Sequence, residues 1–87
     1  MGYNYETMKP KVFTESGQRI LLSIFKNIER YRLFGNKNRM NVNKMIKSVC
    51  GDTWTMLACI NYLEELGEIK LVKKGDMAQF NVYLIEK

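Results

Sequence analysis

Apolar residues recur at helical spacing through the first half of the chain. Between residues 14 and 34 they fall three or four positions apart, at Ile20, Leu21, Ile24, Phe25, Ile28 and Tyr31. Such a stripe predicts an amphipathic helix packed on a core, and Thr14 or Ser16 can cap its start. Leu22 falls outside the stripe. We therefore expect this helix to have a second packing partner, either the N-terminal segment or another subunit.

A short second helix is predicted after the polar loop at residues 35–41. Asn41 or Asn43 can cap it, and its apolar positions are Met45, Ile46 and Val49. Residues 39–41 can form a short strand against a later hairpin.

A third helix is predicted over residues 53–66. Asp52 can cap its start, Gly51 supplies the positive φ that the preceding turn needs, and Gly67 can end it in the left-handed conformation. Its core stripe consists of residues three or four positions apart, namely Met56, Ile60, Leu63 and Leu66.

After residue 67 the period of the apolar positions changes from 3.6 to 2. This alternation predicts two strands, near residues 69–72 and 80–85, joined by a hairpin loop over residues 73–79. Residues 1–13 show no period and contain the single proline, Pro10, so they are interpreted as an N-terminal arm. The sequence thus predicts an α+β fold, with an arm at residues 1–13 and one domain over residues 14–87.

Composition narrows the class of protein. An 87-residue chain with 26% charged residues and no apolar run longer than five residues is expected to be soluble, without a membrane span or a secretory signal, and hence cytoplasmic. Histidine is absent, which removes the commonest catalytic base and zinc ligand. Cys50 and Cys59 are separated by roughly 10 Å of helix rise and are expected to stay reduced. We expect neither an enzyme nor a bound metal or cofactor.

The basic residues precede and follow the third predicted helix in the sequence, and none lies within it. The net charge is +5, and residues 35–47 carry four basic side chains and no acidic one. Residues 48–69 carry four acidic side chains and no basic one, and two lysines follow in the hairpin loop. The basic residues that we take as candidates for phosphate contacts are Lys37, Arg39, Lys44, Lys47, Lys73 and Lys74.

The segment "MLACINYLEELGEIKLV" resembles the recognition-helix ending of the winged helix-turn-helix superfamily of small prokaryotic, archaeal and viral transcription regulators. The resemblance covers about residues 14–85. It implies three helices followed by a C-terminal β-hairpin wing, with double-stranded DNA as the partner. The same architecture also serves as a protein-interaction module.

The resemblance implies a role for each part of the motif. Lys44 and Lys47 would meet phosphates, and Lys73 and Lys74 would touch the neighbouring backbone. The third helix would present its outward positions to a groove: Thr53, Trp54, Thr55, Leu57, Ala58 and Asn61. This helix lacks the arginine or lysine that commonly reads bases, which departs from the family pattern. Six phosphate contacts would give a slope of log K against log salt of about −5.

Two functions stay open at this stage. The first is a DNA-binding transcriptional regulator, forming a homodimer through the arm and the first helix because one module buries little DNA surface. The second is an interaction module without DNA binding, in which Trp54, Leu57 and Cys59 form a protein-binding surface. Trp54 can also be ordinary core packing, and the lysines an ordinary solvated surface. Both functions require that the chain's own arm leaves the front of the third helix free.

Overall fold

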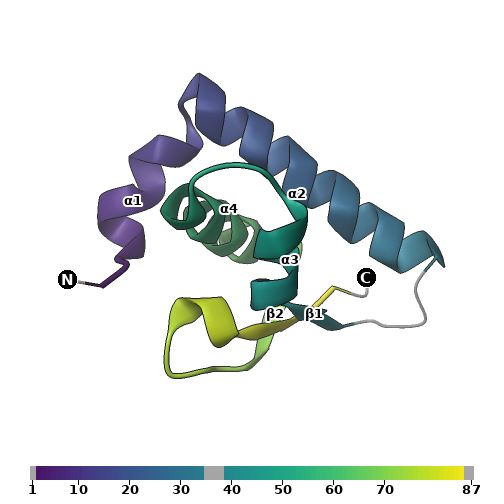
Figure 1. The fold of residues 1–87 in the computed structure, drawn as a ribbon. Coiled ribbons are helices and arrows are strands. Elements are labelled where there is room, and N and C mark those ends of the chain that lie inside the picture. Colours follow the sequence, from purple (N-terminus) through teal and green to yellow (C-terminus); the bar gives the residue numbers. More distant parts are fainter. Residues whose placement is uncertain (1, 35–38, 86–87) are drawn as a thin grey trace.

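The computed structural model describes residues 2–34 and 39–85, which form an α+β fold with four α-helices and a three-stranded antiparallel sheet. In Figure 1, α1 and α2 enclose α4 from one side, and α3 and the sheet lie on the other. The elements in chain order are α1 (Tyr5–Val12), α2 (Glu15–Phe34), β1 (Arg39–Asn41), α3 (Val42–Ser48), α4 (Thr53–Glu65), β2 (Lys70–Lys73), the 3₁₀-helix η1 (Ala78–Phe80) and β3 (Val82–Leu84).

Helix α2 confirms the prediction made from its apolar stripe. The Gly17 N–H donates to Thr14 Oγ1 at 3.0 Å, so Thr14 caps the first turn. Ile20, Ile24 and Ile28 are buried, while the remaining stripe residues are half-buried. Leu22 stays 54% exposed, so no described part of the chain supplies the second packing partner that we expected.

The turn between α3 and α4 also follows the sequence. Asn41 caps α3 and Asp52 caps α4, each by accepting a backbone N–H from the first helical turn. Gly51 adopts a φ of +146°, and a Cβ there would lie 2.7 Å from Ile20 Cδ1. The turn therefore requires glycine for its backbone conformation, and a side chain there would also displace the end of Ile20.

Helix α4 ends in a glycine cap, but one expected core residue lies outside the core. Gly67 has a φ of +80°, and the Glu68 N–H donates to the Leu63 carbonyl at 3.0 Å. This bond is that of a Schellman cap. The prediction that Leu66 belongs to the buried stripe is wrong, since it is exposed. The helix proper ends at Glu65, so the chain is already turning at the last position of the stripe.

Strand β3 lies at the centre of the sheet, with β1 on one side and β2 on the other. The predicted short strand at residues 39–41 is confirmed, since Met40 pairs with Tyr83 of β3. Leu71 of β2 pairs with Tyr83 from the other side. Met40 and Tyr83 are buried, so this row of the sheet faces the core.

Residues 1–13, expected as an arm without regular structure, instead contain helix α1. Asn4 caps it, and Tyr5, Met8 and Val12 lie three and four positions apart on the side that packs on the domain. That spacing was a helix signal, but Pro10 made the segment look irregular. Proline removes only one internal hydrogen bond from so short a helix, and full burial of Val12 holds the helix in place.

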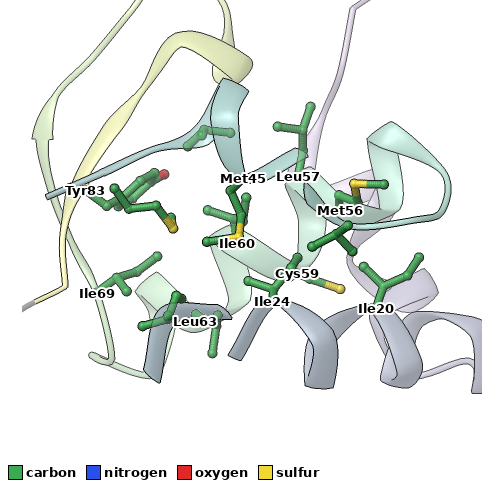
Figure 2. Packing of buried hydrophobic residues seen from close by; sticks show 14 of the residues in the cluster. Ile20, Ile24, Met45, Met56, Leu57, Cys59, Ile60, Leu63, Ile69 and Tyr83 are labelled. Carbon is green, nitrogen blue, oxygen red and sulfur yellow. The ribbon is translucent and has the colours of Figure 1, made fainter. Parts of the chain in front are cut away.

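The core is centred on α4. Figure 2 shows Ile60 of α4 between Tyr83 of β3 and Ile24 of α2, with Cys59 of α4 beside Ile24. Every residue from 55 to 60 is buried; α1 and α2 make the closest contacts with α4, and core residues of α3 and the sheet, such as Met45 and Tyr83, complete the cluster around it. Among the helices of the described residues, none is long and apolar enough to cross a membrane.

Candidate functional site

The outward face of α4, which was expected to meet DNA, is joined to the segment just before α1 by a half-buried hydrogen-bond network. The Tyr3 hydroxyl donates to Asn61 Oδ1 at 2.5 Å, and Asn61 Nδ2 donates to the Tyr83 hydroxyl oxygen at 3.2 Å. The Tyr83 hydroxyl in turn donates to Glu64 Oε1 at 3.2 Å. Burial raises the pKa of Tyr83 to about 12 and also raises the pKa of Tyr3. Both polar groups of the Asn61 side chain are therefore engaged within the protein, and they are not free to contact a base.

A second set of contacts fixes α1 at the C-terminal end of α4. Glu65 accepts hydrogen bonds from the Tyr5 hydroxyl at 2.5 Å and from Lys9 Nζ at 2.8 Å. The bond from Lys9, followed by the bond from Tyr5, lowers the pKa of the Glu65 carboxyl. Next to them, Phe13 meets Tyr62 edge to face, with 5.2 Å between ring centroids.

Three further residues predicted to face the groove are buried, so that part of the prediction is wrong. Thr55 donates its backbone N–H and its hydroxyl to the Asp52 carboxylate, at 3.0 and 2.9 Å. Leu57 and Ala58 belong to the core. The sequence did carry a signal for this burial, because the unbroken apolar run over residues 56–60 covers every side of a helix.

Only the first turn of α4 remains exposed on that face. Thr53 is exposed and Trp54 is 44% exposed. Leu57 and Cys59, which the interaction-module hypothesis also required, are buried, so Trp54 alone remains of that surface. Trp54 borders a hollow of about 340 Å³ formed with the N-terminus and the hairpin loop, whose other lining residues are Gly2, Tyr3, Leu57, Asp76, Met77, Ala78 and Gln79.

The two cysteines lie in different environments, and both are free thiols. Cys50 is exposed at the end of α3. Cys59 is completely buried, and its thiol donates to the Gly17 carbonyl at 3.5 Å. Burial raises the pKa of Cys59 to about 11, which keeps it protonated and unreactive in the folded protein.

In contrast to the outward face of α4, the predicted basic side chains remain accessible. Lys37 lies outside the described residues. The other five are exposed: Arg39, Lys44, Lys47, Lys73 and Lys74. Lys44 and Lys47 are three positions apart on α3 and thus lie on one side of that helix.

Two hollows follow the seam between α2 and the β1–α3 segment. One, of about 320 Å³, is lined by Tyr31, Arg39, Met40, Asn41, Lys44 and Val82. The other, of about 350 Å³, is lined by Ser23, Lys26, Asn27, Arg30, Ser48, Val49 and Cys50. Neither hollow contains a carboxylate. Arg30, which the sequence-based list omitted, therefore extends the positive region from α3 onto α2.

The outer face of the sheet continues this region. Arg39 of β1 and Lys70 of β2 both pair with Leu84 of β3, so all three side chains share one face. Lys73 pairs with Val82 in the next row of the same face. We call the combined region the basic surface and define it as Arg30, Arg39, Lys44, Lys47, Lys70 and Lys73. None of these six forms an ion pair within residues 2–34 and 39–85.

Three acidic residues at the far end of α4 are engaged within the protein instead. Glu64 and Glu65 are bound by tyrosines and by Lys9, as described above. Glu68 lies 4.0 Å from Arg32, which also donates to the Glu68 carbonyl at 3.0 Å. These three carboxylates thus have partners within the protein, and Lys70 of the basic surface follows Glu68 by only two positions.

Comparisons of the chain with protein-family models, with curated proteins and with solved structures found no match. The likeness to winged helix-turn-helix regulators therefore depends on the residues quoted above. What the protein does has to be inferred from the chemistry of its surface.

Proposed function

We propose that this protein binds double-stranded DNA through the phosphate backbone and acts as a small regulator of the winged helix-turn-helix type. The observation that supports this function best is the basic surface, with six exposed cations and no ion-pair partner in the described part of the chain. Unpaired lysines and arginines on one surface attract closely spaced phosphates, and each contact releases a counterion.

The arrangement of elements is compatible with this proposal. Helix α2, the pair α3–α4 with its tight turn at Gly51, and the antiparallel sheet follow one another as in a winged helix. Helix α4 cannot lie lengthwise in a groove, because α1 covers it. The requirement that the N-terminal arm leave the front of this helix free is therefore not met, and the proposal depends on the basic surface instead of on groove reading by α4. Base contacts are therefore limited to Thr53 and Trp54 in its first turn, and we expect affinity to depend weakly on DNA sequence.

The first test measures binding of a labelled duplex by fluorescence anisotropy at several salt concentrations. Six phosphate contacts predict a slope of log K against log salt of about −5 for each protomer that engages the duplex. Lys44→Gln combined with Lys47→Gln should make the slope about two units shallower and weaken binding to all duplexes alike.

A matched control removes the same charge elsewhere. Lys11 and Arg19 are exposed near the α1–α2 junction, away from the basic surface. Lys11→Gln combined with Arg19→Gln should leave the slope unchanged. Equal losses in the two double variants would show that net charge alone drives binding, and undetectable binding at low salt would reject DNA as the partner.

A further inference from the structure

We infer that two copies of the chain pair in antiparallel orientation along the outermost ridge of α2. We define this ridge as Leu22, Lys26, Glu29 and Leu33, the positions on the side of α2 away from the buried isoleucines. Leu22 is 54% exposed and Leu33 is 73% exposed. Two large aliphatic side chains on the outermost side of one helix are an unpartnered apolar feature of the protomer.

A mostly apolar hollow that could accept an aliphatic side chain lies beside this ridge. It has a volume of about 260 Å³ and lies between α2 and the end of α4. Five of its seven lining residues are apolar, and the set is Gln18, Leu21, Leu22, Phe25, Leu63, Leu66 and Glu68. An aliphatic side chain from outside the protomer, inserted next to Leu22, would complete this hollow.

The pattern of charges on the ridge selects a second copy as the occupant. In an antiparallel register that sets Leu33 beside the partner's Leu22, Lys26 lies beside the partner's Glu29. The midpoint between Leu22 and Leu33 coincides with the midpoint between Lys26 and Glu29. A single antiparallel register therefore forms the leucine pairs and the lysine–glutamate pairs at the same time. Two-fold symmetry repeats each contact, giving two leucine pairs and two lysine–glutamate pairs from a single helix.

This interface differs from the dimer contact that the sequence suggested. The arm was expected to contribute, but the apolar residues of α1 pack within the protomer. The ridge also lies apart from the basic surface, except that Lys26 borders the hollow that contains Arg30. A monomeric protomer can therefore still bind DNA, although more weakly than a dimer, and the two proposals are tested by different measurements.

The experiment is sedimentation equilibrium of the full chain over a range of protein concentrations. We expect the wild type to reach the mass of a dimer. Leu33→Asp should give a monomer with an unchanged circular dichroism spectrum, because the leucine is exposed in the protomer. Met77→Asp is the control, since Met77 is also exposed (57%) but lies in the hairpin loop. A wild type that stays monomeric, or a dimeric Leu33→Asp variant, overturns the proposal.

A charge-reversal cycle tests the register itself. Lys26→Glu alone places like charges together at two symmetric contacts and should weaken dimerisation about tenfold. Glu29→Lys alone should have a similar effect, with circular dichroism used to verify the fold because Glu29 also contacts Arg32. The two substitutions combined restore opposite charges and should recover most of the wild-type association. A combined variant as weak as the single ones rejects this register.

Discussion

The substitution Gly17→Ala tests the placement of α1, which decides what α4 can do. Gly17 lies in the first turn of α2, where the end of α1 passes over it. A Cβ at Gly17 would lie 1.9 Å from the Lys11 carbonyl oxygen and 2.8 Å from the Val12 carbonyl carbon. Since Cβ contacts shorter than 3.0 Å essentially do not occur, the end of α1 would have to move by about 1.1 Å.

Two opposing effects determine the sign of the change in stability. Replacing glycine by alanine in a helix normally stabilises a protein by about 0.4–1 kcal/mol, mainly by restricting the unfolded chain. Overpacking against backbone costs about 1–3 kcal/mol, and loosening the fully buried Val12 adds to that cost. We therefore expect a net destabilisation of about 2 kcal/mol.

Urea unfolding followed by circular dichroism measures this difference. A loss of about 2 kcal/mol should lower the midpoint by about 1 M urea. Gly67→Ala is a useful comparison, because a Cβ at Gly67 meets nothing within 4 Å and only the positive φ opposes it. That variant should lose about 1 kcal/mol. If Gly17→Ala were as stable as the wild type or more stable, the end of α1 would not lie against the first turn of α2 as described, and this corner would not hold α1 against α4.

Three further predictions concern single side chains. Arg32→Gln should lower the free energy of unfolding by about 2 kcal/mol, measured in urea, because Arg32 donates to the carbonyls of Ile85 and Glu68. Glu65 has a folded pKa below the ordinary 4.5, so its stabilising contacts with α1 are present above pH 4.5 and lost as pH falls through the folded pKa. The protection factors of the α1 amides, which compare the exchange rate with that of an unfolded chain at the same pH, should therefore fall in acid, and unchanged protection factors contradict this. A thiol reagent should modify Cys50 rapidly in the folded protein but Cys59 only on unfolding, and two equally fast thiols would refute the burial of Cys59.

The local sequence signals predicted α2, α3 and their caps correctly, because each element contains its own signal. The isoleucine stripe of α2 and the capping residues Asn41 and Asp52 act over one or two helical turns. The glycine turn at Gly51 likewise depends on local backbone conformation. None of these predictions needed knowledge of which elements meet in space.

The prediction of the DNA-contacting residues was wrong where the exposure of a side chain depends on residues far away in the sequence. Whether Asn61 faces solvent is decided by Tyr3, which is far away in the sequence. The local pattern of α4 showed which residues were apolar but not that α1 would cover the polar one. The surface cations were predicted better, since lysine and arginine on helices and sheet faces are rarely buried. The charge pattern along the chain does not identify Arg30, because its position beside the end of α3 arises only from the packing of α2 on that segment.

The two proposals are physically coupled through α2, which carries the ridge on one side and Arg30 of the basic surface beside it. A dimer that engages one duplex with both protomers makes about twice as many phosphate contacts, so its salt slope should be about twice that of a monomer. Leu22→Gln combined with Leu33→Gln removes no charge and touches no residue of the basic surface. It should nevertheless make the slope about half as steep and weaken binding, measured by anisotropy at a protein concentration where the wild type is dimeric. An unchanged slope in a variant shown to be monomeric would mean that each protomer binds DNA alone.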